Sequence, residues 1–94
     1  MTAKSFNYTE AVALQLMIAQ QANLQPGEFV WVGGDVHLYL NHLDQAREQL
    51  TREPRPFPTM KLVRHAASID DYRIEDFEVQ GYSPHDAIKA DIAV

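Results

Sequence analysis

Hydrophobic positions along the chain first predict one long helix. Residues 8–24 are rich in alanine, leucine and methionine, which favour helix. Their apolar side chains surround most of the helix axis, a pattern typical of a helix that is buried on nearly every side. A chain of 94 residues can hardly surround such a helix. The pattern therefore indicates that part of its packing lies elsewhere.

Local signals predict where this helix begins and ends. Residues 1–5 have no periodic pattern and predict a loose start. Asn7 is followed three residues later by Glu10, which is the spacing of a capping box. In that motif the Asn7 amide accepts hydrogen bonds from exposed backbone N–H groups. The Gln25–Gly27 stretch, which contains Pro26, predicts a turn that ends the helix.

A strand is predicted from Phe29 to Leu40, with the Gly33–Gly34 pair as a bend or bulge inside it. Beyond the glycines, apolar and polar residues alternate, so His37 and Tyr39 fall on the same face. Their spacing sets the imidazole and the phenol about 7 Å apart along the strand. The strand is therefore expected to present two hydrogen-bonding rings side by side.

The remaining pattern predicts a second helix and two more strands. The helix begins at Asn41 or His42 and ends at Arg52, because prolines at 54, 56 and 58 force an extended link. Residues 59–65 and 76–82 predict strands, and residues 83–94 predict an extended tail. The expected fold class is α+β: a long buried helix, a small mixed or antiparallel sheet and a second helix.

Composition and charge narrow the classes of function. The formal net charge is −5, which argues against binding to nucleic acid or to an anionic membrane. There is no cysteine, so these residues supply neither a thiol nucleophile nor a thiolate metal site. No signal peptide is visible, and the longest apolar run, near Ala11–Ala19, is too short to span a bilayer. A soluble cytoplasmic protein is expected.

Most candidate constellations fail on spacing. His37 and His42, with Asp35 or Asp44, match no compact metal-ligand pattern, so no metal site is expected. No serine lies in a Gly-x-Ser-x-Gly context, and the glycine pair matches neither a phosphate loop nor a dinucleotide fingerprint. A run of carboxylates is predicted to be a solvated surface; its members are Asp70, Asp71, Glu75 and Asp76.

Two sets of residues keep both a binding and a structural interpretation. The rings of His37 and Tyr39 can hydrogen-bond a ligand hydroxyl, or they can pack half-buried beneath a helix. The amide of Asn7 presents a donor beside an acceptor, which suits the imide edge of a pyrimidine. As a helix cap, Asn7 would need no ligand.

The stretches "GGDVHLYLNH" and "REPRP" together resemble the C-terminal portion of thymidylate synthase, and the resemblance runs from Phe6 to Val94. That family methylates deoxyuridylate (dUMP) to thymidylate (dTMP) with 5,10-methylenetetrahydrofolate. The resemblance implies that Asn7 contacts the uracil ring and that His37 and Tyr39 bind the 3′-hydroxyl of the deoxyribose. It makes Val94 the C-terminal residue whose carboxylate helps to close the site over the folate.

The resemblance also shows what these residues lack. The family's nucleophilic cysteine, its phosphate-binding arginines, its catalytic glutamate and most folate contacts lie upstream of the matching region. Residues 1–5 do not resemble the family, Glu10 stands in a segment that is usually small and apolar, and Asp86 and Asp91 stand where the family often has proline. We therefore expect one partial domain over residues 1–94, a gene remnant or a truncated product of the larger enzyme.

Two interpretations follow for what the chain does. In the first, it is a thymidylate synthase fragment with no catalytic residue and no bound cofactor of its own, inactive alone and weak in binding dUMP. In the second, it is a non-enzymatic interaction module derived from that enzyme. In both, the apolar first helix and unpaired strand edges predict a partner, either a second copy or a complementary N-terminal half. A compact monomer would need the tail to fold back over that helix.

Overall fold

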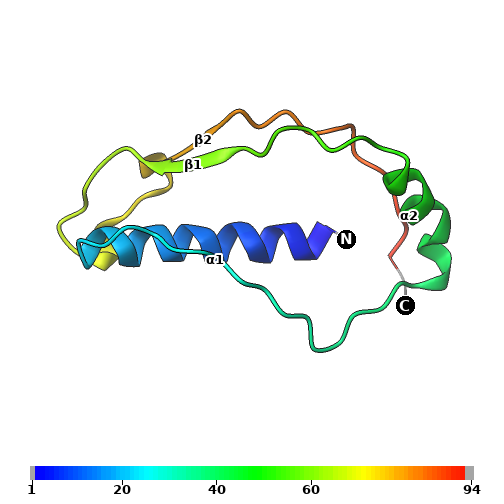
Figure 1. The fold of residues 1–94 in the computed structure, drawn as a ribbon, viewed down its shortest axis with the longest axis horizontal. Coiled ribbons are helices and arrows are strands. Elements are labelled where there is room, and N and C mark those ends of the chain that lie inside the picture. The colour runs from blue at the N-terminus through cyan, green and yellow to red at the C-terminus, as the bar shows by residue number, and fades with distance from the viewer. Residues whose placement is uncertain (1, 93–94) are drawn as a thin grey trace.

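The computed structural model describes residues 2–92 of the chain, and side chains from residue 8 onward. Helix α1 spans Thr2–Gln21, helix α2 spans Leu43–Leu50, and strands β1 (Thr59–Leu62) and β2 (Phe77–Gln80) form a hairpin-like pair. The hairpin lies over the C-terminal half of α1, whereas α2 lies at the far end of the molecule (Figure 1). The α+β class predicted from the sequence is confirmed.

Helix α1 begins earlier than predicted and ends earlier as well. It starts at Thr2, so the prediction of a loose start and of a capping box at Asn7 is wrong. None of the residues before Asn7 is a helix breaker, and the helix simply continues through them. At its other end Asn23 adopts a left-handed conformation with φ 53°, and the Leu24 N–H donates to the Ala19 carbonyl at 2.8 Å. The turn therefore precedes the Gln25–Gly27 stretch.

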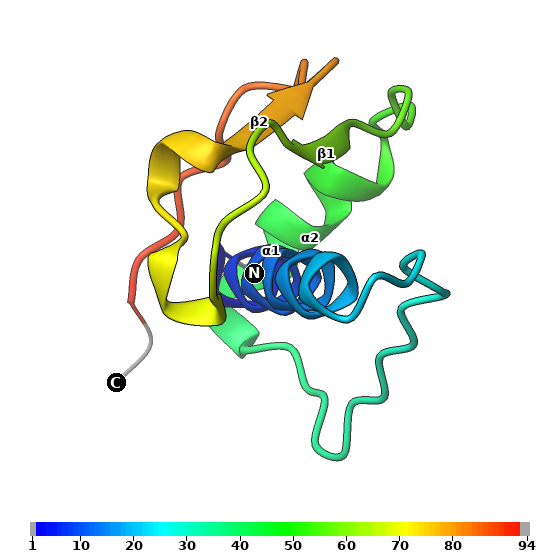
Figure 2. The same ribbon diagram turned by 90° about the vertical axis from the view of Figure 1, so that its left-hand side faces the viewer.

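The two strands are antiparallel, with Thr59 opposite Gln80 and Leu62 opposite Phe77. Both strands were predicted, and both are shorter than predicted. Burial alternates along β1, where Met60 and Leu62 are half-buried while their neighbours are exposed. The view along α1 shows the hairpin on one side of the helix and the segment of residues 24–40 on another (Figure 2). Strand β1 and the C-terminal half of α1 thus pack against each other.

The predicted strand from Phe29 to Leu40 is wrong. This segment is irregular, with a bend at Gly34–Asp35, and in residues 2–92 its backbone pairs with no other strand. Strand formation depends on a neighbouring strand to accept the backbone hydrogen bonds. The alternation of side chains remains, since Phe29 and Trp31 both contact the ring of Tyr8 on α1. Val30 and Val32, which alternate with them, are 70% and 84% exposed.

Helix α2 confirms the predicted second helix, shortened at both ends and preceded by a 3-10 turn over Leu40–His42. The tail of residues 83–92 is extended, as predicted, but it runs beside α2 rather than folding over α1 (Figure 1). Side chains hold its backbone: Arg52 donates to the Asp86 carbonyl at 2.6 Å, and Arg55 donates to the Pro84 carbonyl at 3.0 Å. These bonds use carbonyl oxygens, so they do not depend on the side chain at position 86.

The hydrophobic core is very small. Among the described residues, only Ala19 and Ala66 are buried apolar side chains, while Leu14 and Ile18 of α1 are each about half exposed. The chain exposes 8163 Å², whereas a folded monomer of this mass is expected to expose about 5,500 Å². Its radius of gyration is 16.6 Å, against about 12 Å for a compact domain of this length. In this chain alone, α1 lacks the burial that its sequence predicts.

The apolar character of α1 does not extend far enough for a membrane span. Within residues 2–92, no helix combines the length and the hydropathy needed to cross a bilayer.

Candidate functional site

The structure brings the predicted pair of rings together. The centroids of the His37 and Tyr39 rings lie 5.2 Å apart with their planes at 84°, an edge-to-face contact. His42, in the 3-10 turn before α2, also packs against Tyr39 with a centroid distance of 5.7 Å. The His37 side chain is 57% exposed and Tyr39 is 52% exposed. The pair is thus open to solvent and does not pack beneath a helix.

A carboxylate precedes this pair on the same stretch of chain. The Nδ1 atom of His37 lies 3.1 Å from the Oδ1 atom of Asp35. Gly34 and Asp35 form the bend that turns the backbone at this point, and the two side chains stand two residues apart. An extended chain directs such side chains to one side. The site therefore consists of a carboxylate, an imidazole and a phenol in a row, with all three accessible.

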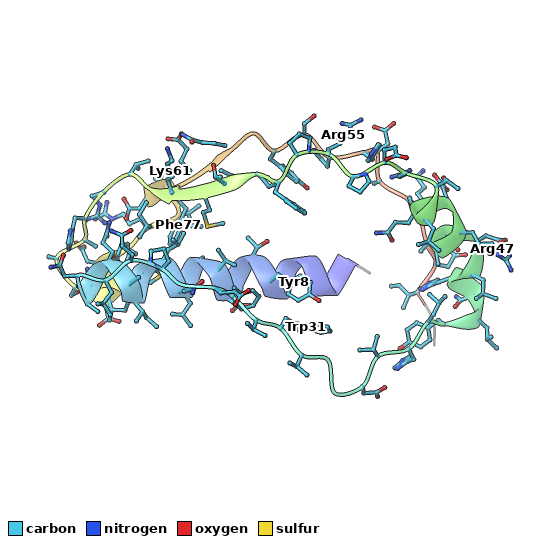
Figure 3. All side chains as sticks on the ribbon, in the orientation of Figure 1. Tyr8, Trp31, Arg47, Arg55, Lys61 and Phe77 are labelled. Atoms are coloured by element: carbon cyan, nitrogen blue, oxygen red, sulfur yellow. The ribbon has the colours of Figure 1, made fainter. Side chains whose placement is uncertain are left out.

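The other predicted site residues lie elsewhere or outside the described part. Asn7 lies within α1, next to Tyr8, whose ring contacts Trp31 at a centroid distance of 5.3 Å (Figure 3). These ring contacts join α1 to the segment that leads to His37. Val94 lies outside the described residues.

The histidines and carboxylates considered as metal ligands do not converge. In residues 2–92 no three side chains of His, Asp or Glu gather closely enough to hold a metal ion. His42 turns its Nε2 atom toward the Asp91 carbonyl at 2.6 Å, and Asp44 accepts a bond from Arg47 at 2.9 Å. His42 and Asp44 are therefore engaged in separate contacts, while His37 and Asp35 contact each other.

A shallow groove lies away from Asp35, His37 and Tyr39. It has a volume of about 410 Å³ and lies between the end of α1 and β1, where Leu16 and Met60 are among its apolar residues and Lys61 and His65 among its polar ones. A smaller hollow, of about 190 Å³, lies between the proline-rich link and the tail and includes Arg55 and Tyr82. Neither is lined by His37 or Tyr39.

The prediction of a solvated carboxylate run is wrong for two of its members. Asp76 is only 5% exposed and accepts bonds from Arg64 Nε at 2.8 Å and Arg64 Nη2 at 2.6 Å. Asp71 accepts a bond from Arg64 Nη1 at 3.0 Å. The two carboxylates and the guanidinium, here called the Arg64 cluster, connect the end of β1 to the turn before β2. Arg64 is separated from Asp76 by twelve positions, a distance that spacing rules do not cover.

Hydrogen bonds shift the titration of the Arg64 cluster. The bonds from the Arg64 side chain, followed by the bond from the Arg73 backbone N–H, hold the pKa of Asp76 below its ordinary value. The Arg64 side chain and then the Ala67 backbone lower the pKa of Asp71 in the same way. The bonds to Asp76, and secondly those to Asp71, raise the pKa of Arg64 further. In the folded state the cluster therefore favours its charged form.

The Arg64 cluster predicts acid sensitivity. Because the carboxyl pKa values are lowered on folding, their contribution to stability is present above the unfolded value of about 4 and is lost as pH falls through the folded values. Asp76→Asn should lower the denaturation midpoint at pH 7 and flatten its dependence between about pH 5 and pH 2. Denaturant titrations followed by circular dichroism across that range measure both effects.

The neighbouring Glu75→Gln substitution is the matched control. Glu75 is exposed, and its substitution removes the same charge as Asp76→Asn. It should leave both the midpoint and its pH dependence close to those of the unchanged chain. Equal effects of the two substitutions would show that net charge, rather than the Arg64 cluster, governs acid sensitivity.

Comparison with known proteins points to one protein family. A sequence model of the thymidylate synthase family matches residues 1–94. The chain is 74% identical over 90 residues to a thymidylate synthase of Rhodopseudomonas palustris, covering 96% of this chain and 30% of that protein. It is 71% identical to one of Cereibacter sphaeroides, with 95% and 30% covered, and 63% identical to one of Rhizobium rhizogenes, with 95% and 29% covered. The chain thus spans less than a third of the length of these curated relatives.

Proposed function

The chain belongs to the thymidylate synthase family, and on that premise we propose that its 94 residues carry the part of a dUMP site that binds the deoxyribose hydroxyl and the uracil edge. The observation that carries the proposal is the exposed pair of His37 and Tyr39, whose rings lie 5.2 Å apart. An imidazole and a phenol can each donate or accept one hydrogen bond. Two such groups at this separation suit a single hydroxyl that both donates and accepts.

Asn7 supplies the base contact in this proposal. Its amide offers a donor and an acceptor side by side, matching the N–H and C=O of a uracil edge. Asn7 lies on α1, and the Tyr8 contacts with Phe29 and Trp31 tie this part of α1 to the strand-like segment that precedes His37. These ring contacts therefore connect the element with the proposed base contact to the segment with the proposed sugar contact.

The remaining steps of dUMP methylation belong, in this proposal, to residues beyond these 94. No cysteine is present to attack the pyrimidine. The described residues do not by themselves fit 5,10-methylenetetrahydrofolate, because the groove beside β1 and the hollow beside the tail are lined by residues other than His37 and Tyr39. Val94 is the one proposed contact to the folate side. These residues bind and orient dUMP, and covalent chemistry takes place on a larger assembly.

The proposed partner is either a second copy or the complementary N-terminal part of the family sequence. The chain exposes about 2,700 Å² more than expected for a monomer of its mass, which exceeds the roughly 800 Å² that each partner buries in a standard interface. The exposed apolar residues of α1 and of residues 29–32 belong to that excess. The same observation favours the second candidate function, a non-enzymatic module that pairs through these surfaces. Binding of dUMP at His37 separates the two.

Titration with dUMP tests the proposed site directly. We expect a dissociation constant of about 1 mM or weaker, equivalent to about 4 kcal/mol, because arginine–phosphate pairs are among the stronger polar contacts and none is implied within these residues. Nuclear magnetic resonance should show ligand-dependent shifts at His37 and Tyr39. His37→Ala should abolish the shifts at Tyr39.

His65→Ala is the control, since His65 is an exposed histidine on the groove at the other end of the molecule. It should leave the titration unchanged. A micromolar dissociation constant, or shifts confined to the groove, would contradict the proposed site.

A further inference from the structure

The contact between Asp35 and His37 has no structural explanation so far. Their side chains meet at 3.1 Å through Oδ1 and Nδ1. The Asp35 side chain is 88% exposed, so it stabilises no core and has no evident packing role. A carboxylate two residues before a ligand-binding imidazole is instead in a position to control that imidazole.

The contact determines which ring nitrogen carries the hydrogen. An ionised carboxylate has no proton and can only accept. The bond at 3.1 Å therefore requires Nδ1 of His37 to donate, and a neutral imidazole with its hydrogen on Nδ1 presents a lone pair at Nε2. We propose that Asp35 is a positioning residue that holds His37 in this tautomer, so that His37 accepts, rather than donates, a hydrogen bond from the ligand. The inference rests on the proposed function for the identity of that ligand.

This tautomer sets a requirement on the group that binds between His37 and Tyr39. If Nε2 of His37 accepts, the ligand must supply a hydrogen, and the phenol of Tyr39 is then left to donate to the ligand oxygen. A secondary alcohol satisfies both partners. A phosphate ester, an ether or a ketone at the same position has no hydrogen for Nε2, and two lone pairs would face each other. The row Asp35–His37–Tyr39 thus selects a free hydroxyl at the sugar.

The second histidine of the site provides an internal comparison. His42 packs on Tyr39, but its Nε2 atom lies 2.6 Å from the Asp91 carbonyl. A carbonyl also only accepts, so the neutral ring of His42 must carry its hydrogen on Nε2. The structure therefore assigns opposite tautomers to two histidines five positions apart, and His42 has no Nε2 lone pair left for a ligand.

Nitrogen chemical shifts of the imidazoles test the inference on the 94-residue chain without any ligand. At pH 8, where an ordinary imidazole is neutral, we expect His37 mainly as the Nδ1–H tautomer and His42 mainly as the Nε2–H tautomer. Asp35→Ala should convert His37 to mainly Nε2–H, the form that histidine favours in water, while His42 stays unchanged. Asp35→Asn should lower the share of the Nδ1–H form, because its amide offers Nδ1 a donor as well as an acceptor.

Asp44→Ala is the matched control, because Asp44 is an exposed aspartate paired with Arg47 and not with a histidine. It should alter neither ring. The inference is overturned if His37 is mainly Nε2–H in the unchanged chain, or if Asp35→Ala leaves its tautomer as it was. Backbone amide shifts that stay in place outside residues 33–39 verify that each variant remains folded.

Titration with two ligands separates this inference from the proposed function. Deoxyuridylate should shift the His37 resonances at millimolar concentration, and its 3′-O-methyl derivative should lose at least most of that shift. Equal shifts with both ligands would overturn the selection of a free hydroxyl by the Nδ1–H tautomer. If the tautomers are as expected but neither ligand shifts the His37 resonances, the proposed dUMP site is contradicted. The assignment of Asp35 as a positioning residue would then still stand.

Discussion

A polypeptide of just these 94 residues, produced in a host without its own thymidylate synthase, will form no thymidylate above background. The family reaction begins with attack by a cysteine thiolate, and no cysteine is present among these residues. No serine lies in a Gly-x-Ser-x-Gly context that could take the place of that cysteine. Removal of a nucleophile from an enzyme costs on the order of 10⁶-fold in turnover, so the rate should be indistinguishable from that of buffer.

The measurement is tritium release from labelled dUMP in the presence of the folate, with a full-length relative as the positive control. His37→Ala, which alters only the proposed sugar contact, should give the same background value. Turnover that is retained through repeated purification and lost in His37→Ala would contradict the assignment of catalysis to residues outside this segment.

The second large effect expected is self-association of the isolated chain. Sedimentation at micromolar concentration should show species of at least two copies instead of a single one at 10.7 kDa, and an apolar dye should bind. The reason is the exposed apolar surface of α1 and of residues 29–32. Ile18→Lys should weaken dimerisation roughly thirtyfold, because Ile18 is 53% exposed, burial of its exposed half is worth about 1 kcal/mol, and a dimer carries the substitution twice.

Ile74→Lys is the matched control, because Ile74 is 88% exposed and lies in the 3-10 turn before β2, outside α1 and outside residues 29–32. It should leave the association constant near that of the unchanged chain. A monodisperse 10.7 kDa species without dye binding would mean that the helix is covered within one chain. A compact monomer covered by its own tail is not what the structure shows, since the tail contacts residues 42–55.

The sequence predicted the pairing of His37 and Tyr39 even though the strand that was to hold them did not form. Side chains two residues apart lie on one side of any extended backbone, whether or not a neighbouring strand is present. The strand itself depends on backbone partners that residues 2–92 do not supply. The placement of the two rings side by side was therefore predictable, whereas the pairing of their backbone with another strand was not.

The start of α1 and the Arg64 cluster were missed for different reasons. Asn7 and Glu10 have capping-box spacing, yet nothing between Thr2 and Asn7 stops the helix, and continued backbone bonding extends it to Thr2. Asp76 is buried by a partner twelve positions away. The available signal was Asp76 itself, three residues after Arg73, where it accepts the Arg73 backbone N–H at 2.8 Å and so closes a turn.

The most direct test of the account is reconstitution of the proposed dUMP site. The chain is mixed with the upstream two thirds of the Rhodopseudomonas palustris relative, which is 74% identical over the shared region, and tritium release from labelled dUMP is measured. The account predicts turnover in the mixture, none from either part alone, and a loss of at least tenfold when the chain carries His37→Ala. A mixture that associates by sedimentation yet shows no turnover, or full turnover with His37→Ala, would contradict it.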